Sequence, residues 1–284
     1  QRIIELQNQS HGFKINKTSH IKLTDYIQSV AEKKSENEVR KTVLHAVVYH
    51  LRRYNPNDIQ LSRIDKDYIL GFLDYLKTAK QTHTKKEKLL HVNTQVYYYK
   101  MLRYCLNYAV SEELISANPM NKIKNEEKPH KHRTEREYLT IDELRKLAQT
   151  PFYNGLLKKA FLFSCFCGLR HSDIIALTWG DIEMDDDGNF RLYIIQKKTK
   201  EAISLPLSQE AIKQLPKRED AKEDDIIFKK LITLGRTNEI LPKWAEQAGI
   251  KKHITFHTAR HTHATMMITL GADIYTVSKL LGHT

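Results

Sequence analysis

The sequence has no hydrophobic run long enough to cross a membrane. Its longest apolar stretch runs from Ala160 to Cys167 and is interrupted by Ser164. A membrane helix needs about 18 or more consecutive apolar residues. Neither end has the pattern of a secretory signal or a transit peptide. We therefore expect a protein without a membrane partner that works in the cytoplasm.

Cysteine, glycine and proline are also scarce. Three cysteines, Cys105, Cys165 and Cys167, are too few for a disulfide framework, which favours a reducing compartment. Ten glycines, seven prolines and 28% charged residues exclude collagen-like and low-complexity proteins. With 284 residues, of which 40% are apolar, the chain can bury the cores of one large or two ordinary domains.

Negative charge is in deficit, because 34 acidic residues face 46 lysines and arginines and leave a net charge of +12. Residues 1–140 hold 25 basic and 16 acidic side chains, whereas residues 141–284 hold 21 and 18. An excess of this size is a first indication of a polyanionic partner such as nucleic acid. A basic surface that is merely solvated would give the same totals, so charge alone does not decide.

The N-terminal part is predicted to be helical. Residues 1–21 are polar and weakly patterned, and we interpret them as a strap or the end of an upstream domain. From residue 22 to residue 122, apolar side chains recur at helical spacing in four stripes with short connections between them. One stripe consists of Val39, Val43, Val47 and Leu51. Residues 22–122 therefore predict a compact helical domain.

A hydrophilic linker is predicted for residues 123–137, which contain almost no apolar side chains after Ile123. Beyond it, Thr140 is followed three residues later by Glu143. This spacing is a capping box, which marks the start of a helix. We therefore place a second domain at residues 138–284.

The second domain is predicted to mix helices with a small sheet. A buried helix ends at Gly168, and a further helix is expected over Ile174 to Leu177. Two extended segments, Arg191 to Gln196 and Ala202 to Pro206, flank a short polar turn and predict a β-hairpin. The predicted fold is mainly α, with an α+β C-terminal domain that carries a small antiparallel sheet.

The closing segment is rich in histidine, which raises the question of a metal site. His257 and His261 are four residues apart and can share a helix face. However, Thr258 stands where a zinc-protease helix would carry glutamate, and Arg260 would repel a cation. We expect no metal and no cofactor.

A phosphate site explains the same residues better. His257 and Arg260 are three residues apart and would share the face of a first helical turn. A guanidinium offers two donors to phosphate oxygens, and an imidazole can also move a proton. Arg170 supplies a second guanidinium, with Asp173 three residues on to support it. An ordinary salt bridge between Arg170 and Asp173 is the alternative interpretation.

Four segments of the sequence resemble the tyrosine recombinases, the phage integrase family. The first runs from Cys167 to Asp173 and continues through Trp179 to Ile182. The other three are Lys198 with Thr199 before a strand, His257 to Thr265, and Leu280 to His283. The resemblance is close over residues 138–284. It extends more loosely over 22–122, where the family has a helical core-DNA-binding domain.

The resemblance implies a transesterification without metal or ATP. A tyrosine attacks a DNA phosphate, leaving a 3′-phosphotyrosyl bond and a free 5′-hydroxyl. Arg170 and Arg260 would stabilise the phosphorane, and Lys198 would protonate the leaving 5′-oxygen. His257 would exchange a proton with the nucleophile, and His283 would bond the scissile phosphate. Asp173 would support the site without reacting. Lys197 and Lys200 are the alternatives to Lys198 as the catalytic lysine.

The family's nucleophilic tyrosine follows the last histidine, and no tyrosine follows His283 in the 284 residues. Tyr275 precedes that histidine within a predicted helix and is not a substitute. We interpret the chain as shortened before the nucleophile and expect it to bind DNA without cleaving it. Two other functions remain open, a non-catalytic DNA-binding protein on this fold and, less well matched, a type IB topoisomerase.

Double-stranded DNA is the expected partner, held mainly through its phosphates. The resemblance implies an integrase of a bacterial mobile element, associated with the nucleoid, that assembles as a homotetramer on DNA with DNA-bending accessory proteins. Candidate phosphate contacts are Lys80, Lys85, Lys86, Lys88, Lys122, Lys124, Lys131 and Arg133.

Overall fold

The computed structural model describes residues 20–34, 38–81, 87–132 and 135–282. The chain divides into two compact units, an N-terminal unit, Gln1–Thr134, and a C-terminal unit, Glu135–Thr284. Each unit has its own hydrophobic core. Among the described residues, no helix is both long enough and apolar enough for a membrane crossing.

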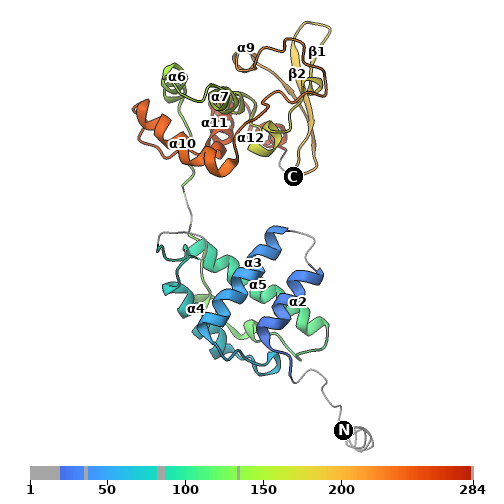
Figure 1. The fold of residues 1–284 in the computed structure, drawn as a ribbon, viewed down its shortest axis with the longest axis vertical. Coiled ribbons are helices and arrows are strands. Elements are labelled where there is room, and N and C mark those ends of the chain that lie inside the picture. The colour runs from blue at the N-terminus through green and yellow to red at the C-terminus, as the bar shows by residue number, and fades with distance from the viewer. Residues whose placement is uncertain (1–19, 35–37, 82–86, 133–134, 283–284) are drawn as a thin grey trace, which may run out of the picture. The chain divides into compact units, whose positions relative to one another are not determined.

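Among its described residues, the N-terminal unit is built from four helices, as the sequence predicted (Figure 1). They are α2 (Leu23–Lys34), α3 (Glu38–Tyr54), α4 (Lys66–Thr78) and α5 (Val92–Ser111). Helix α3 packs against the other three. Short 3-10 turns complete the unit: η1 (Leu61–Arg63), η2 (Pro119–Lys122) and η3 (Asn125–Glu127).

The buried face of α3 differs from the predicted stripe. Val39, at its first end, is 66% exposed. The apolar residues that the helix buries are Leu44, Val47, Val48 and Leu51. A strict four-residue repeat drifts around a helix of 3.6 residues per turn, so a stripe of that kind leaves the core after about two turns. The prediction identified the helix but assigned part of the wrong face.

Most of the predicted linker belongs to the N-terminal unit. Ile123 is only 4% exposed and lies in its core. Glu127 forms an ion pair of 2.8 Å with Lys66 of α4. The backbone N–H of His132 donates to Asn93 Oδ1 at 2.8 Å, and Asn93 Nδ2 donates to the His132 carbonyl at 3.1 Å. Polar composition predicted a hydrophilic linker, and these side-chain contacts attach most of that segment to the N-terminal unit.

The C-terminal unit combines helices with a small sheet (Figure 1). Its helices are α6 (Ile141–Gln149), α7 (Gly155–Cys167), α8 (His171–Ile174), η4 (Trp179–Asp181), α9 (Gln209–Ile212), α10 (Leu234–Gln247), α11 (Phe256–Thr269) and α12 (Ile274–Leu280). Helix α7 packs against α11 in the core. This architecture agrees with the predicted mainly α fold and its α+β second domain.

The sheet is antiparallel with the strand order β1-β2-β3. Its strands are β1 (Ile182–Met184), β2 (Phe190–Ile195) and β3 (Ala202–Pro206). The hairpin of β2 and β3 is the predicted one, with Leu192 opposite Leu205. Both of these side chains are buried, so one face of the hairpin covers the core.

Local sequence signals set several boundaries in this unit. Helix α6 begins with the predicted capping box, in which Thr140 Oγ1 accepts from the Glu143 N–H and Glu143 accepts from the Thr140 N–H. The helix expected over Ile174 to Leu177 is wrong, because α8 ends at Ile174. Thr178 instead pairs as an extended residue with Ile226, and this bridge requires the chain to leave the helix.

Candidate active site

Arg170 lies directly after the turn that ends α7. Gly168 takes up φ +71° there, a left-handed conformation that favours glycine, and its N–H donates to the Ser164 carbonyl at 2.8 Å. The Ser164 hydroxyl donates to the Leu169 carbonyl at 2.7 Å. Arg170 precedes α8 and makes no capping bond with its side chain. Its guanidinium is half-buried and donates from Nη1 to Gln196 Oε1.

Arg260 is the fifth residue of α11 and is only 3% exposed. Its Nη1 donates to the Gly168 carbonyl at 2.8 Å, and its Nη2 donates to the Leu281 carbonyl. Burial lowers its pKa to about 10, and the charge of Arg170 adds to this effect. Because Arg260 holds the turn that carries Arg170, the two guanidiniums occupy one site.

Lys198 lies at the exposed tip of the turn between β2 and β3. The backbone N–H of Lys197, the residue before Lys198, donates to Asp173 Oδ1 at 3.0 Å. This hydrogen bond holds the turn in place beside the candidate lysine. Asp173 is buried. Asp173 and Arg170 are both among the described residues, and no ion pair joins them. Asp173 therefore supports the turn of Lys198 and does not neutralise Arg170.

His257 connects these residues electrostatically. Its pKa is lowered by partial burial of the ring and then by the positive charges of Arg260, Arg136, Arg170 and Lys198. The ring is in edge contact with His261, with the centroids 4.5 Å apart. The described residues contain no group of three or more metal-type ligands. What lies beside His257 is a set of cations suited to an anion.

Two residues of this site were missed from the sequence. Gln196 is fully buried between the arginines, and no charge or motif marked it. Arg136 lies in the stretch interpreted as a linker, where its proximity to Arg133 and Lys131 made it one basic residue among several. The predicted His283 lies outside the described residues, as do Lys85, Lys86 and Arg133.

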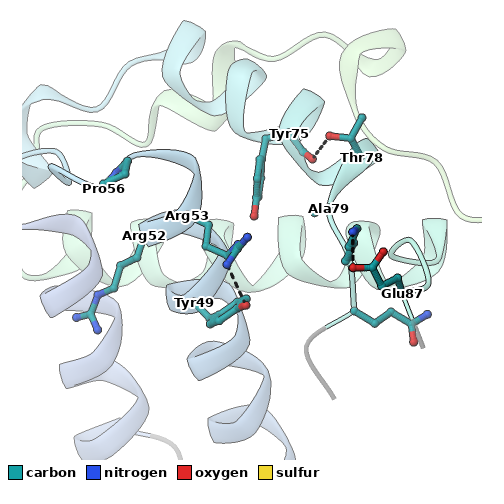
Figure 2. Close-up of a pocket in the computed structure, with 10 residues that line it drawn as sticks. Tyr49, Arg52, Arg53, Pro56, Tyr75, Thr78, Ala79 and Glu87 are labelled. Atoms are coloured by element: carbon teal, nitrogen blue, oxygen red, sulfur yellow. Dashed lines mark hydrogen bonds and ion pairs between the residues drawn. The ribbon is translucent and has the colours of Figure 1, made fainter. Parts of the chain in front are cut away.

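A basic cleft of about 730 Å³ lies in the N-terminal unit (Figure 2). Arg52, Arg53 and Tyr49 of α3 line one part of it, with Tyr75 of α4 opposite. Arg53 Nη1 donates to the Tyr49 hydroxyl at 3.5 Å, and the guanidinium lies 5.6 Å from the centre of the Tyr49 ring. The adjacent arginines were a basic signal in the sequence that the prediction did not use.

The predicted lysine contacts are distributed around this unit. Lys80 lines the cleft but is ion-paired with Glu87 at 2.8 Å (Figure 2). A backbone bridge pairs Lys80 with Leu89, the residue after the candidate Lys88. The other exposed candidates among the described residues are Lys88, Lys122, Lys124 and Lys131. All five remain predictions for DNA contact.

Both parts of the sequence match known family domains. Residues 137–284 match the phage integrase family, and residues 22–128 match the phage integrase SAM-like domain. The tyrosine recombinase XerC of Pelotomaculum thermopropionicum is 24% identical over 277 residues, which cover 90% of this chain and 86% of that protein. The tyrosine recombinase XerD of Listeria monocytogenes is 26% identical over 278 residues, with 87% and 90% covered.

Solved structures share the fold. A lambda integrase fragment in a dimer bound to a COC′ core site has a TM-score of 0.70 and 21% identity, and the match covers 92% of this chain and 90% of that one. The Tn1549 transposon integrase in complex with circular intermediate DNA also has a TM-score of 0.70, at 14% identity and with 93% and 92% covered. The family match spans more than half of the chain and agrees with both relatives and with the fold. The chain therefore belongs to the phage integrase family, the tyrosine recombinases of site-specific DNA recombination.

Proposed function

We propose that this protein is an integrase that cleaves and rejoins double-stranded DNA through a 3′-phosphotyrosyl intermediate. The observation that carries the proposal is the convergence of Arg170, Arg260 and Lys198 on His257. Such a set of cations stabilises the charge that develops on a phosphate during transesterification. The related XerC and XerD proteins are named as tyrosine recombinases, which supports the same chemistry here.

Each residue has a defined part in the proposed reaction. The tyrosine oxygen attacks phosphorus while the bond from phosphorus to the 5′-oxygen breaks. His257 accepts the tyrosine proton, and its lowered pKa keeps the ring neutral and ready to do so near pH 7. Lys198 gives a proton to the departing 5′-oxygen, and its exposed position on a turn lets the ammonium reach it. His283 would donate a hydrogen bond to the scissile phosphate.

Arg170 and Arg260 differ in the way they serve this phosphate. Two N–H donors of Arg260 are bonded to backbone carbonyls, so its main contribution is a positive charge held in a fixed position. Arg170 is half-buried and makes one bond to Gln196, which leaves other N–H groups of its five to bind phosphate oxygens. We propose that Arg170 makes the more direct contact. Arg136, whose positive charge helps to lower the pKa of His257, is a further phosphate contact.

DNA binding by the N-terminal unit is proposed to use the cleft of α3 and α4 together with the surface lysines. Arg53 offers its guanidinium to backbone phosphates, with Tyr49 stacked below it. Arg52 would have to exchange its ion pair of 3.5 Å with Asp25 for a phosphate. The weaker candidate is Lys80, because its ion pair with Glu87 must open first. The lysines outside the cleft would add affinity that depends on salt and not on base sequence.

The proposed substrate is two duplexes held by four protomers. A lambda integrase tetramer bound to a Holliday junction has this fold, with a TM-score of 0.71 at 20% identity, which supports a tetramer of this protein on DNA. We propose that the chain serves a bacterial mobile element, with its DNA sites in the nucleoid and with DNA-bending accessory proteins. We also place the nucleophilic tyrosine after His283, outside the 284 residues. The polypeptide 1–284 alone then binds DNA and does not cleave it.

A suicide-substrate assay tests this function. The protein expressed from its complete reading frame should form a covalent adduct with nicked DNA, whereas the polypeptide 1–284 should bind the same DNA and form none. Arg170→Ala should abolish the adduct, and Arg145→Ala, which removes an exposed arginine of α6, should leave it intact. Binding without any adduct from the complete protein would instead assign a non-catalytic DNA-binding role.

A further inference from the structure

Gln196 is an uncharged side chain buried among the cations of the site. It is 0% exposed and follows the last residue of β2. Its Oε1 accepts from Arg170 Nη1 and from the Thr199 hydroxyl, the latter at 2.9 Å. Its Nε2 donates to the Leu281 carbonyl at 3.1 Å, and Arg260 Nη2 donates to that same oxygen. One amide thus links both arginines through a single chain of hydrogen bonds.

The same residue closes the turn that carries Lys198. The Gln196 N–H donates to the Glu201 carbonyl at 2.9 Å, and the Lys200 N–H donates to the Gln196 carbonyl at 2.9 Å. Thr199, inside the turn, bonds the side-chain oxygen of the same glutamine. Lys198 is therefore held between residues that are fixed to Gln196, while its own side chain stays exposed.

Close packing holds the amide in place, and its hydrogen-bond partners fix its orientation. Gly282, at φ +62°, lies so near that a Cβ there would come within 2.6 Å of Gln196 Oε1 and 3.0 Å of its Nε2. The oxygen must face Arg170 and the nitrogen must face the Leu281 carbonyl. The reverse orientation would place the amide N–H groups against the Arg170 donors and the amide oxygen against the Leu281 carbonyl oxygen. An amide satisfies both sides, whereas glutamate would lack the donor and add a negative charge.

The absence of charge on Gln196 has a functional meaning. A carboxylate at this place would pair with Arg170 and cancel part of the field that the phosphate needs. A neutral amide orients the guanidinium and leaves its charge to the substrate. We infer that Gln196 is a positioning residue that aligns Arg170 and Arg260 and sets the turn of Lys198 against them. This inference rests on the proposed transesterification and adds to it a residue that does not itself touch the DNA.

The test uses the complete protein and two versions of a suicide substrate. One has the natural 5′-oxygen leaving group, and the other has sulfur at that position. A thiolate leaves without a proton because thiols have a pKa near 8.5, far below that of an alcohol, so the sulfur substrate bypasses Lys198. Lys198→Ala serves as the reference, since it should be slow on oxygen and nearly normal on sulfur.

Gln196→Ala should slow single-turnover cleavage of the oxygen substrate by about 10- to 100-fold, the size expected for a misplaced catalytic group. The deficit should be clearly smaller on sulfur, and DNA affinity should change by less than about threefold, since charge is retained. Gln196→Glu, similar in size, should be at least as slow as Gln196→Ala on oxygen. Gln209→Ala, an exposed glutamine of α9, should match the wild type.

The possible outcomes distinguish a failure of this inference from a failure of the proposed transesterification. Equal deficits of Gln196→Ala on oxygen and sulfur would show that Gln196 does not set Lys198, and near-normal cleavage by Gln196→Glu would show that a neutral amide is not needed beside Arg170. Either result would overturn the inference. Wild-type protein that forms no adduct on either substrate would instead overturn the proposed transesterification. A tryptophan-fluorescence unfolding curve for each variant distinguishes slow chemistry from an unfolded protein.

Discussion

Acid should destabilise the C-terminal unit through His263. This side chain of α11 is 5% exposed, and its Nδ1 has no hydrogen-bond partner among the described residues. Burial lowers its pKa from 6.5 to about 4, against the opposing effect of nearby backbone carbonyls. A histidine with a lowered folded-state pKa stabilises the fold above its unfolded pKa, and this stability is lost as the pH falls toward the folded value.

The size of the effect follows from the two pKa values. Between pH 6.5 and pH 4 the unfolded chain binds the proton and the folded chain does not. Linkage then gives a loss of about 2 kcal/mol at pH 5 relative to pH 7, rising toward about 3 kcal/mol below pH 4. Other titrating groups add to the total, so the comparison must be with a variant that lacks only this imidazole.

Urea unfolding followed by tryptophan fluorescence measures this loss in the C-terminal unit alone. Both tryptophans, Trp179 and Trp244, belong to this unit, and Trp244 is fully buried in its core. Between pH 7 and pH 5, His263→Gln should lose about 2 kcal/mol less stability than the wild type. His253→Gln, at an exposed position, should lose as much as the wild type. If His263→Gln shows the full wild-type loss, the assigned protonation is refuted.

Three further variants test the site and its support. Gly168→Ala forces a side chain into φ +71° and within 2.7 Å of the His263 ring, so it should cost about 2 kcal/mol by urea unfolding, while Gly155→Ala, with nothing within 4 Å, should cost nothing. Arg260→Lys cannot reach both carbonyls with one ammonium and should cut cleavage by the complete protein about 100-fold, with DNA affinity nearly constant in a filter-binding assay. Tyr275→Phe, at a residue that is 69% exposed, should form adducts at the wild-type rate, and loss of the adduct would identify this tyrosine as the nucleophile.

Local signals in the sequence were sufficient for the framework of the fold. The capping box at Thr140 and the glycine stop at Gly168 act through the nearest backbone groups, so their spacing alone places the helix ends. The alternation of buried and exposed residues in the hairpin is likewise local. The segment that bears Arg170 and the helix turn that bears Arg260 were found in this way, together with the resemblance that relates them.

What the sequence did not reveal depends on contacts between distant residues. Gln196 acquires its role from Arg170 and Leu281, which are 26 and 85 residues away, and a lone glutamine carries no sign of such partners. The attachment of the segment after Ile123 depends on single side-chain bonds that composition cannot express. Asp173 remains a predicted supporting residue, and its observed partner is the Lys197 N–H and not the arginine of its own turn.

Because two donors share the Leu281 carbonyl, the position of the residues at the end of α12 affects the geometry of the arginine site. Arg260 and Gln196 both donate to this oxygen, and Gly282 presses against the glutamine amide in the next residue. Any displacement of Leu281 and Gly282 would therefore move the acceptor of both donors and, in the proposed reaction, change the electric field at the phosphate. The position of this turn and the alignment of the two arginines are thus set together.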